Sequence, residues 1–224
     1  MSPEPNPATF VLIHGGGSSS WDWHLVVPEL RAYGHDVVAV DLPIENPANG
    51  ISEYADAVIA EIGDRSNIVV VAHSYGGLTA PVVCSRLDTE LLILVSGMIP
   101  VPGAAPDAWW ADAGFRDVAM DTREQIIDAF MHDVPADLAA EALRRERNDA
   151  SAKGSEPVPL EDWPRVPTRF LLCRDDRFFP PEFMRPLVRE RLGIEPDEID
   201  GSHCVMLSHP KALADNLIRY WSQV

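Results

Sequence analysis

The sequence predicts an α/β fold: a six-stranded, mainly parallel sheet with helices on both faces. Two observations support this prediction. Short apolar runs alternate along the chain with longer segments whose apolar residues recur every three or four positions, which is typical of βαβ units. The run at residues 68–72 contains only Ile, Val and Ala, the composition of a strand that is buried on both sides of a parallel sheet.

The expected strands are separated by segments long enough to form helices. We expect strands at residues 10–13, 36–40, 67–72, 91–95, 169–173 and 198–200. We expect helices at residues 23–33, 51–63, 74–87, 183–192 and 210–221. Because connections between parallel strands are right-handed, these helices should cover both faces of the sheet.

One long interval interrupts the alternation. Residues 98–163, between the fourth and fifth strands, show no strand pattern but two helical ones, at 123–132 and 135–149. An insertion after the carboxyl end of a strand lies over the edge where α/β sheets bind ligands. We therefore expect a small helical lid at about 98–163, inserted into a single domain that spans residues 1–224.

Composition and charge exclude several kinds of partner. Of the 224 residues, 46% are hydrophobic and 24% charged, as in ordinary globular proteins. The net charge of −17 repels polyanions, so we expect neither nucleic acid nor a membrane as partner and favour a neutral or cationic small molecule. No run approaches the roughly 20 apolar residues of a membrane span. Residues 1–7 lack the features of a secretion signal, and we expect them to form a loose tail; residues 1–6 lie outside the part of the chain that the structure describes.

The cysteines and histidines show neither disulfide nor metal-site spacing. Cys84, Cys173 and Cys204 fit no disulfide framework and no zinc site, which favours a cytoplasmic location. The histidines outside the proposed site likewise lack a metal-binding spacing. We expect no metal, no cofactor, and a monomer or homodimer.

The third expected strand runs directly into Ser74, which is flanked by small residues. A sharp strand-to-helix turn leaves no room for side chains two positions away, and Ala72 and Gly76 meet this requirement. Such a turn exposes the serine hydroxyl beside the first N–H groups of the next helix. The pattern predicts a nucleophile elbow, although a simple turn is the alternative for the serine taken alone.

A serine nucleophile needs a histidine base and an acid that orients this base. Asp175 and Asp176 follow the fifth expected strand, and His203 follows the sixth. The order serine, aspartate, histidine is that of α/β hydrolases. Taken alone, Asp176 could be a helix cap and His203 a surface residue, so the prediction depends on their combination.

A glycine-rich loop follows the first expected strand. At Gly15, Gly16 and Gly17 the backbone can approach a substrate closely. We expect the N–H groups of Gly16 and Tyr75 to form the oxyanion hole, and Gly15 to contact the substrate. Met98, Met206, Trp109 and Trp110 are further candidates for substrate contact, with burial in the core as the alternative for the tryptophans.

From about residue 9 to residue 221 the chain resembles small α/β hydrolases of the plant methylesterase and hydroxynitrile lyase branch. Residues 14–23 match its opening loop, 34–42 its second strand, 176–183 its acid loop and 203–207 its histidine segment. The resemblance implies Asp176, rather than Asp175, as the acid of the triad. It also implies a serine hydrolase of small esters.

Two departures from that branch bear on the chemistry. Ala72 replaces the commoner glycine of the elbow. The lyases carry a lysine after the catalytic histidine and a threonine in the glycine loop, whereas this chain has Cys204 and Gly15-Gly16 there. Ester hydrolysis is therefore favoured, with a lyase, a carbon–carbon bond hydrolase or a non-catalytic receptor for small molecules as alternatives.

Overall fold

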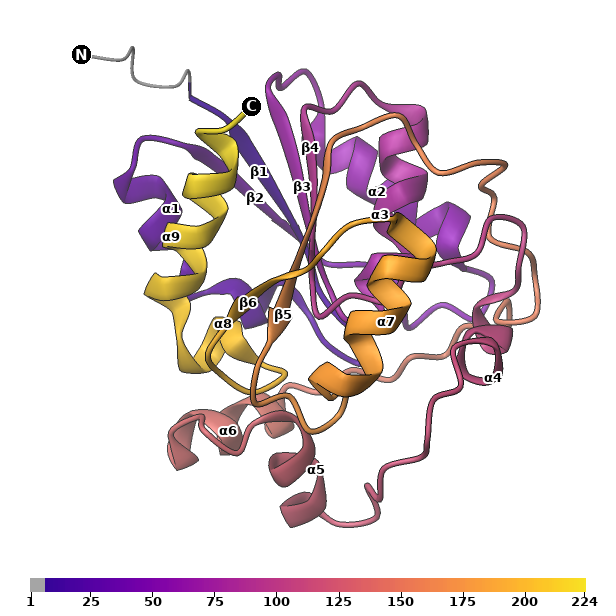
Figure 1. Ribbon diagram of the computed structural model, residues 1–224, viewed down its shortest axis with the longest axis vertical. Helices are drawn as coiled ribbons and strands as arrows, with labels where there is room; N and C mark the ends of the chain where they lie inside the picture. Colours follow the sequence, from indigo (N-terminus) through magenta and orange to yellow (C-terminus); the bar gives the residue numbers. More distant parts are fainter. Residues whose placement is uncertain (1–6) are drawn as a thin grey trace.

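A six-stranded sheet, parallel throughout, forms the centre of the computed structural model, which describes residues 7–224 (Figure 1). The strand order is β2-β1-β3-β4-β5-β6, and each neighbouring pair is parallel. The strands are β1 (Thr9–Ile13), β2 (Asp36–Val40), β3 (Ile68–His73), β4 (Leu91–Val95), β5 (Thr168–Cys173) and β6 (Asp197–Ile199). The α/β fold class is confirmed, and all six strands lie where the sequence predicts them.

Helices cover both faces of the sheet, because alternate residues of each buried strand point to opposite sides. On one face Val70 and Leu92 pack with α2 (Ile51–Ile62), α3 (Gly76–Arg86) and α7 (Pro181–Leu192). On the other face Val71 and Ile93 pack with α1 (Val26–Ala32) and α9 (Pro210–Trp221). The two apolar layers hold the strands in place, so the loops at their carboxyl ends have a rigid support.

The first helix is shorter than the sequence predicts. A 3₁₀ turn, η1 (Ser20–Trp23), comes before α1, which begins only at Val26. Pro28 lacks a backbone N–H and is best tolerated in the first helical turn, which favours a helix that begins only shortly before it. The turn η1 thereby remains a separate element beside the glycine loop.

The segment between β4 and β5 divides into two parts. The first part, η2 (Pro106–Ala108) and α4 (Trp109–Asp112), packs on the α3 and α7 side of the molecule. The second part, α5 (Arg123–Phe130) and α6 (Ala136–Arg144), lies below the carboxyl ends of the strands in Figure 1. The polar residues 145–149 follow α6, which therefore ends earlier than predicted. Within residues 7–224 no helix combines the length and apolar character needed to cross a membrane.

Candidate active site

Ser74 lies in the tight turn between β3 and α3. Its φ of 50° is in the left-handed region, which is strained for a residue other than glycine. Neighbouring segments leave no space for side chains: a Cβ at Gly76 would lie 2.5 Å from the His14 carbonyl oxygen, and one at Gly77 2.2 Å from that of Met98. The Ser74 carbonyl accepts hydrogen bonds from the N–H groups of Gly77 (3.0 Å) and Met98 (2.8 Å). The strained turn is thus held by its surroundings.

The glycine loop after β1 approaches the serine closely. A Cβ at Gly15 would lie 3.1 Å from the Cβ of Ser74, and one at Gly16 3.5 Å from that of Tyr75. Within residues 7–224, the N–H groups of Gly16 and Tyr75 donate to no protein acceptor. Two free backbone donors therefore flank the serine.

His14 braces this loop as a neutral imidazole. Its Nε2 accepts a hydrogen bond from the Leu42 N–H at 3.0 Å, so Nδ1 carries the proton and donates to the Gly15 carbonyl at 2.7 Å. Burial lowers the pKa of His14 to about 4. The loop is therefore held by an uncharged side chain at neutral pH.

Asp176 and His203 form a buried pair at the same edge of the sheet. The Nδ1 atom of His203 donates to Oδ2 of Asp176 at 2.7 Å, and both side chains are almost fully buried. The other carboxylate oxygen accepts hydrogen bonds from the N–H groups of Phe178 (2.9 Å) and Phe179 (2.7 Å). Because Nδ1 donates to a carboxylate, Nε2 of His203 carries the free lone pair that a general base requires.

Aromatic rings and a second histidine hold His203 in place. Phe130, Phe178 and Phe179 each meet its imidazole edge-on, at centroid distances of 5.2–5.3 Å. The His203 carbonyl accepts a hydrogen bond from Nε2 of His73 at 3.0 Å. Burial keeps the pKa of His73 well below its usual value, so this ring acts as a neutral donor.

Ser74 and His203 both line one cavity but are not hydrogen-bonded to each other. Among the described residues, Nε2 of His203 has no hydrogen-bond partner. Catalytic hydrogen bonds are often long or absent in ligand-free proteins and form when substrate binds. The structure brings the predicted serine, aspartate and histidine together at one edge of the sheet, with the lone pair of the imidazole free.

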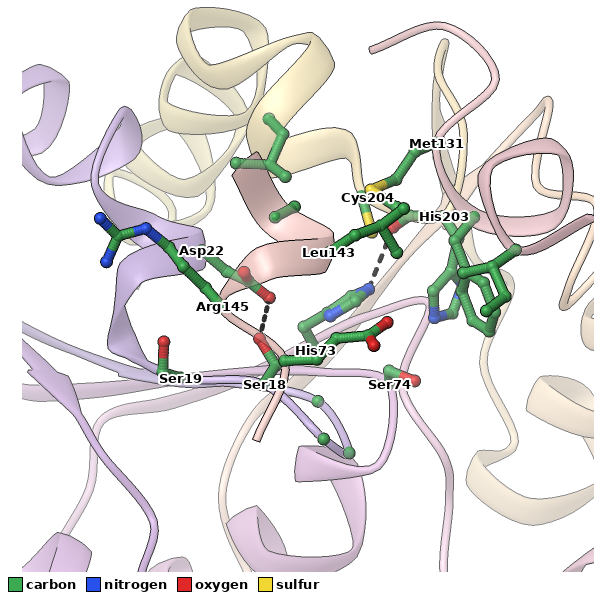
Figure 2. A pocket seen from close by; sticks show the side chains of 18 residues that line it. Ser18, Ser19, Asp22, His73, Ser74, Met131, Leu143, Arg145, His203 and Cys204 are labelled. Atoms are coloured by element: carbon green, nitrogen blue, oxygen red, sulfur yellow. Dashed lines mark hydrogen bonds between the residues drawn. The ribbon is translucent and has the colours of Figure 1, made fainter. Parts of the chain in front are cut away.

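The cavity has a volume of about 140 Å³ and two chemically different ends (Figure 2). Its floor consists of the glycine loop, Ser74 and the His203 loop. Its roof is formed by α5, α6 and the two residues after α6. One group of lining side chains is mainly apolar: Ile126, Phe130, Met131, Ala142, Leu143, Cys204 and Leu207. The polar group is Ser18, Ser19, Asp22, Arg145 and Glu146.

Of the five residues predicted to contact substrate, only Gly15 lines this cavity. Trp109 is buried in the core, where its indole N–H donates to the Ile99 carbonyl at 2.9 Å. Trp110 packs edge-on against Trp109, at a centroid distance of 5.3 Å. Met98 braces the elbow through its backbone, and Met206 is a fully buried residue of α8 (Val205–Ser208). None of the other four lines this cavity; burial in the core, the alternative for the tryptophans, describes Trp109, whereas Trp110 is half-buried against it.

Asp175 takes no part in the buried pair. Its carboxylate accepts a hydrogen bond from the Gly201 N–H at 3.1 Å, and its carbonyl accepts one from Nε2 of His132 at 2.8 Å. It thus links the loops after β5 and β6. Among residues 7–224 no cluster of three or more potential metal ligands is present.

The sequence predicts helices over this edge of the sheet, but it identifies neither the roof residues that line the cavity nor Asp22. Helical spacing indicates that Ile126 and Leu143 lie on apolar helix faces, but not which surface these faces cover. Asp22 lies within the matched opening loop, next to two tryptophans, and a carboxylate between large apolar residues was the available signal.

Comparison with known proteins gives a consistent picture. Residues 10–216 match the alpha/beta hydrolase family. The chain is 26% identical to the probable esterase PIR7A of Oryza sativa subsp. indica, over 94% of this chain and 95% of that protein. It is 24% identical to methylesterase 3 of Arabidopsis thaliana, over 97% of each chain. The crystal structure of polyneuridine aldehyde esterase superimposes with a TM-score of 0.80 at 20% identity, covering 96% of this chain and 99% of the other.

Proposed function

This chain belongs to the alpha/beta hydrolase family, and from this premise we propose that it is a serine esterase that cleaves small carboxylic esters. The observation that carries the proposal is the buried Asp176–His203 pair, 2.7 Å between Oδ2 and Nδ1, whose His203 lines the same cavity as the strained Ser74. Curated relatives named as esterases, each about a quarter identical to this chain, support the same reaction.

In the proposed mechanism, Ser74 attacks the ester carbonyl while Nε2 of His203 takes its proton. Asp176 holds the imidazole in the required tautomer and stabilises the cation that forms. The free N–H groups of Gly16 and Tyr75 bind the developing oxyanion. His203 then protonates the leaving alcohol, and a water molecule, deprotonated by the same imidazole, releases the acid from the acyl-enzyme.

We propose that α5 and α6 act as the lid of this site. Backbone contacts attach the insertion to the floor: the Arg147 N–H donates to the Gly17 carbonyl at 2.8 Å, and the Cys204 N–H donates to the Phe130 carbonyl at 2.9 Å. The lid therefore supplies apolar substrate contacts and limits the access of bulk solvent to the site, while the water molecule that hydrolyses the acyl-enzyme still enters.

Cys204 supports ester hydrolysis over cleavage of cyanohydrins. Burial, followed by the nearby Asp22 carboxylate, raises the pKa of this thiol well above its usual value, so it stays neutral. A neutral thiol next to His203 gives no positive charge for a cyanide leaving group. The three free cysteines suit our further proposals of a cytoplasmic location and a monomer or homodimer.

Covalent labelling tests the proposed nucleophile. A fluorophosphonate should modify Ser74 of the wild-type protein, and mass spectrometry of the peptides locates the adduct. Ser74→Ala should lose the label and about 10⁴- to 10⁶-fold in hydrolysis of p-nitrophenyl acetate. Ser85→Ala, at the far end of α3, is the matched control and should keep both. Turnover retained by Ser74→Ala would reject the assignment.

A further inference from the structure

The cavity contains a carboxylate that lacks a cationic partner. Asp22, from η1, lines the same cavity as Ser74 (Figure 2). One of its oxygens accepts a hydrogen bond from the Ser18 hydroxyl, and within residues 7–224 the other has no hydrogen-bond partner. Arg145, which also lines the cavity, pairs instead with Glu141 (2.5 Å, Nε to Oε1) and lies over the Trp21 ring.

This carboxylate is costly to maintain. Burial raises the pKa of Asp22 to about 6, although the Ser18 hydrogen bond and nearby His24 oppose the shift. At neutral pH the group is therefore ionised, and within residues 7–224 the Ser18 hydroxyl is its only hydrogen-bond donor. Anchoring Ser18 does not require a charge, since a neutral amide oxygen accepts the same hydrogen bond. The negative charge is best explained by a ligand that neutralises it.

The position of Asp22 relative to the reacting groups limits what such a ligand looks like. Asp22 is close enough to Cys204, the neighbour of His203, to raise the pKa of its thiol. Apolar side chains such as Leu143 and Leu207 complete the cavity wall. A molecule that reaches both Ser74 and Asp22 therefore has a reactive carbonyl, a short apolar stretch and a positively charged end. The net charge of −17 also attracts cations to the protein.

We propose that Asp22 is a specificity-determining residue, and that the cavity selects small esters carrying a protonated amine a few carbon atoms from the carbonyl. The ammonium N–H donates to the oxygen of Asp22 that Ser18 leaves free. This inference rests on the proposed esterase function for its chemistry, but the binding it describes can be measured separately.

Two pairs of esters with matched shapes test the proposal. 2-(Dimethylamino)ethyl acetate is compared with 3-methylbutyl acetate, and methyl 4-(dimethylamino)butanoate with methyl 5-methylhexanoate. Within each pair a protonated dimethylamino group replaces an isopropyl group, on the alcohol or on the acyl side. At about pH 7 both the amine and Asp22 are charged. We expect kcat/KM to favour the cationic ester of at least one pair by roughly tenfold or more.

Three variants show which side chain causes the preference for the cationic ester. Asp22→Asn keeps the Ser18 contact and should bring the cationic-to-neutral ratio of kcat/KM to near one. Asp64→Asn, an exposed site at the opposite end of the strands, removes the same charge and should leave the ratio unchanged. If the cationic-to-neutral ratio of kcat/KM falls in Glu146→Gln but not in Asp22→Asn, then Glu146 recognises the cation, and the proposal is overturned. Absence of any preference in the wild type would also overturn it.

Binding without turnover separates this proposal from the proposed function. Ser74→Ala should bind the preferred cationic ester more tightly than its neutral partner, as measured by isothermal titration calorimetry. Ser74→Ala/Asp22→Asn should lose that difference. If the wild type hydrolyses neither ester but the binding difference depends on Asp22, the esterase function fails and the cation site stands. Equal binding of both esters by Ser74→Ala contradicts the cation site, whatever the rate of hydrolysis.

Discussion

The floor and the roof of the cavity are built in different ways. Floor residues are fixed by short-range backbone constraints: Ser74 by its strained φ and two hydrogen bonds to its carbonyl, Asp176 by two N–H donors. The roof helices α5 and α6 face the cavity with aliphatic and aromatic side chains held by packing. Packing tolerates substitution better than directed hydrogen bonds do. The floor should therefore determine the reaction, and the roof the choice of substrate.

The largest effect that would test this contrast is expected at Asp176. Asp176→Asn should lower kcat by roughly 10³- to 10⁴-fold, because an amide no longer holds the required His203 tautomer or stabilises the imidazolium. Steady-state kinetics with p-nitrophenyl acetate measures it, and circular dichroism checks the fold. Asp175→Asn is the neighbouring control and should retain activity within a fewfold. Equal losses in both variants would contradict the assignment of Asp176 as the acid.

A smaller effect, on stability, is expected at Asp22. Its pKa is about 6 in the folded protein and 3.8 when unperturbed, so the folded state binds the proton more tightly. The stability of the wild type relative to Asp22→Asn should therefore fall as pH rises from about 4 to 6. Above that range the variant should be more stable by up to about 3 kcal/mol.

Urea denaturation at about pH 4 and pH 8 measures this difference. Asp64→Asn, which removes an exposed carboxylate, controls for net charge. If the free energy of unfolding depends on pH identically in the wild type and in Asp22→Asn, then burial does not raise the pKa of this carboxylate. Keeping the Asp22 carboxylate ionised would then have no cost in the free energy of unfolding.

The smallest effect is expected in the roof. Leu143→Ala enlarges the cavity and should change KM a fewfold, in favour of longer acyl chains, with kcat little altered. The loss of stability should be about 1–2 kcal/mol, because the side chain already borders open space. Leu138→Ala, on the same helix but away from the cavity, should leave chain-length preference unchanged. A large fall in kcat for Leu143→Ala would end the distinction between floor and roof.

The floor residues can be predicted from the sequence because each belongs to a short local pattern. These patterns are the apolar run into Ser74, the glycines around it, and the aspartate and histidine that directly follow strands. Parallel strands then bring their carboxyl ends to one edge. This is why Asp176 and His203, 27 residues apart, lie 2.7 Å from one another as an interacting pair.

The roof and the depth of side chains depend on tertiary packing, which a single sequence does not reveal. Trp109 lies in an insertion and could face either a ligand or the core; Phe179, whose ring it contacts in the core, comes from a distant segment. Asp22 is similar, since a carboxylate in a 3₁₀ turn is usually exposed, whereas Asp22 lines a cavity that is roofed by α5 and α6. Helical periodicity predicts that the apolar faces of α5 and α6 are buried, but it does not show which surface they pack against.

The two anchors between insertion and floor bear on how a substrate arrives. Arg147 is bonded to the glycine loop through its N–H, and through its guanidinium to the carbonyls of Ser18 and Leu42. Phe130 is bonded to the histidine loop. Helices that are hydrogen-bonded to the floor on both sides are restrained from opening as a flap. Arg145 and Glu146 line the cavity and are exposed, so we expect substrate to enter beside them without a large movement of these helices.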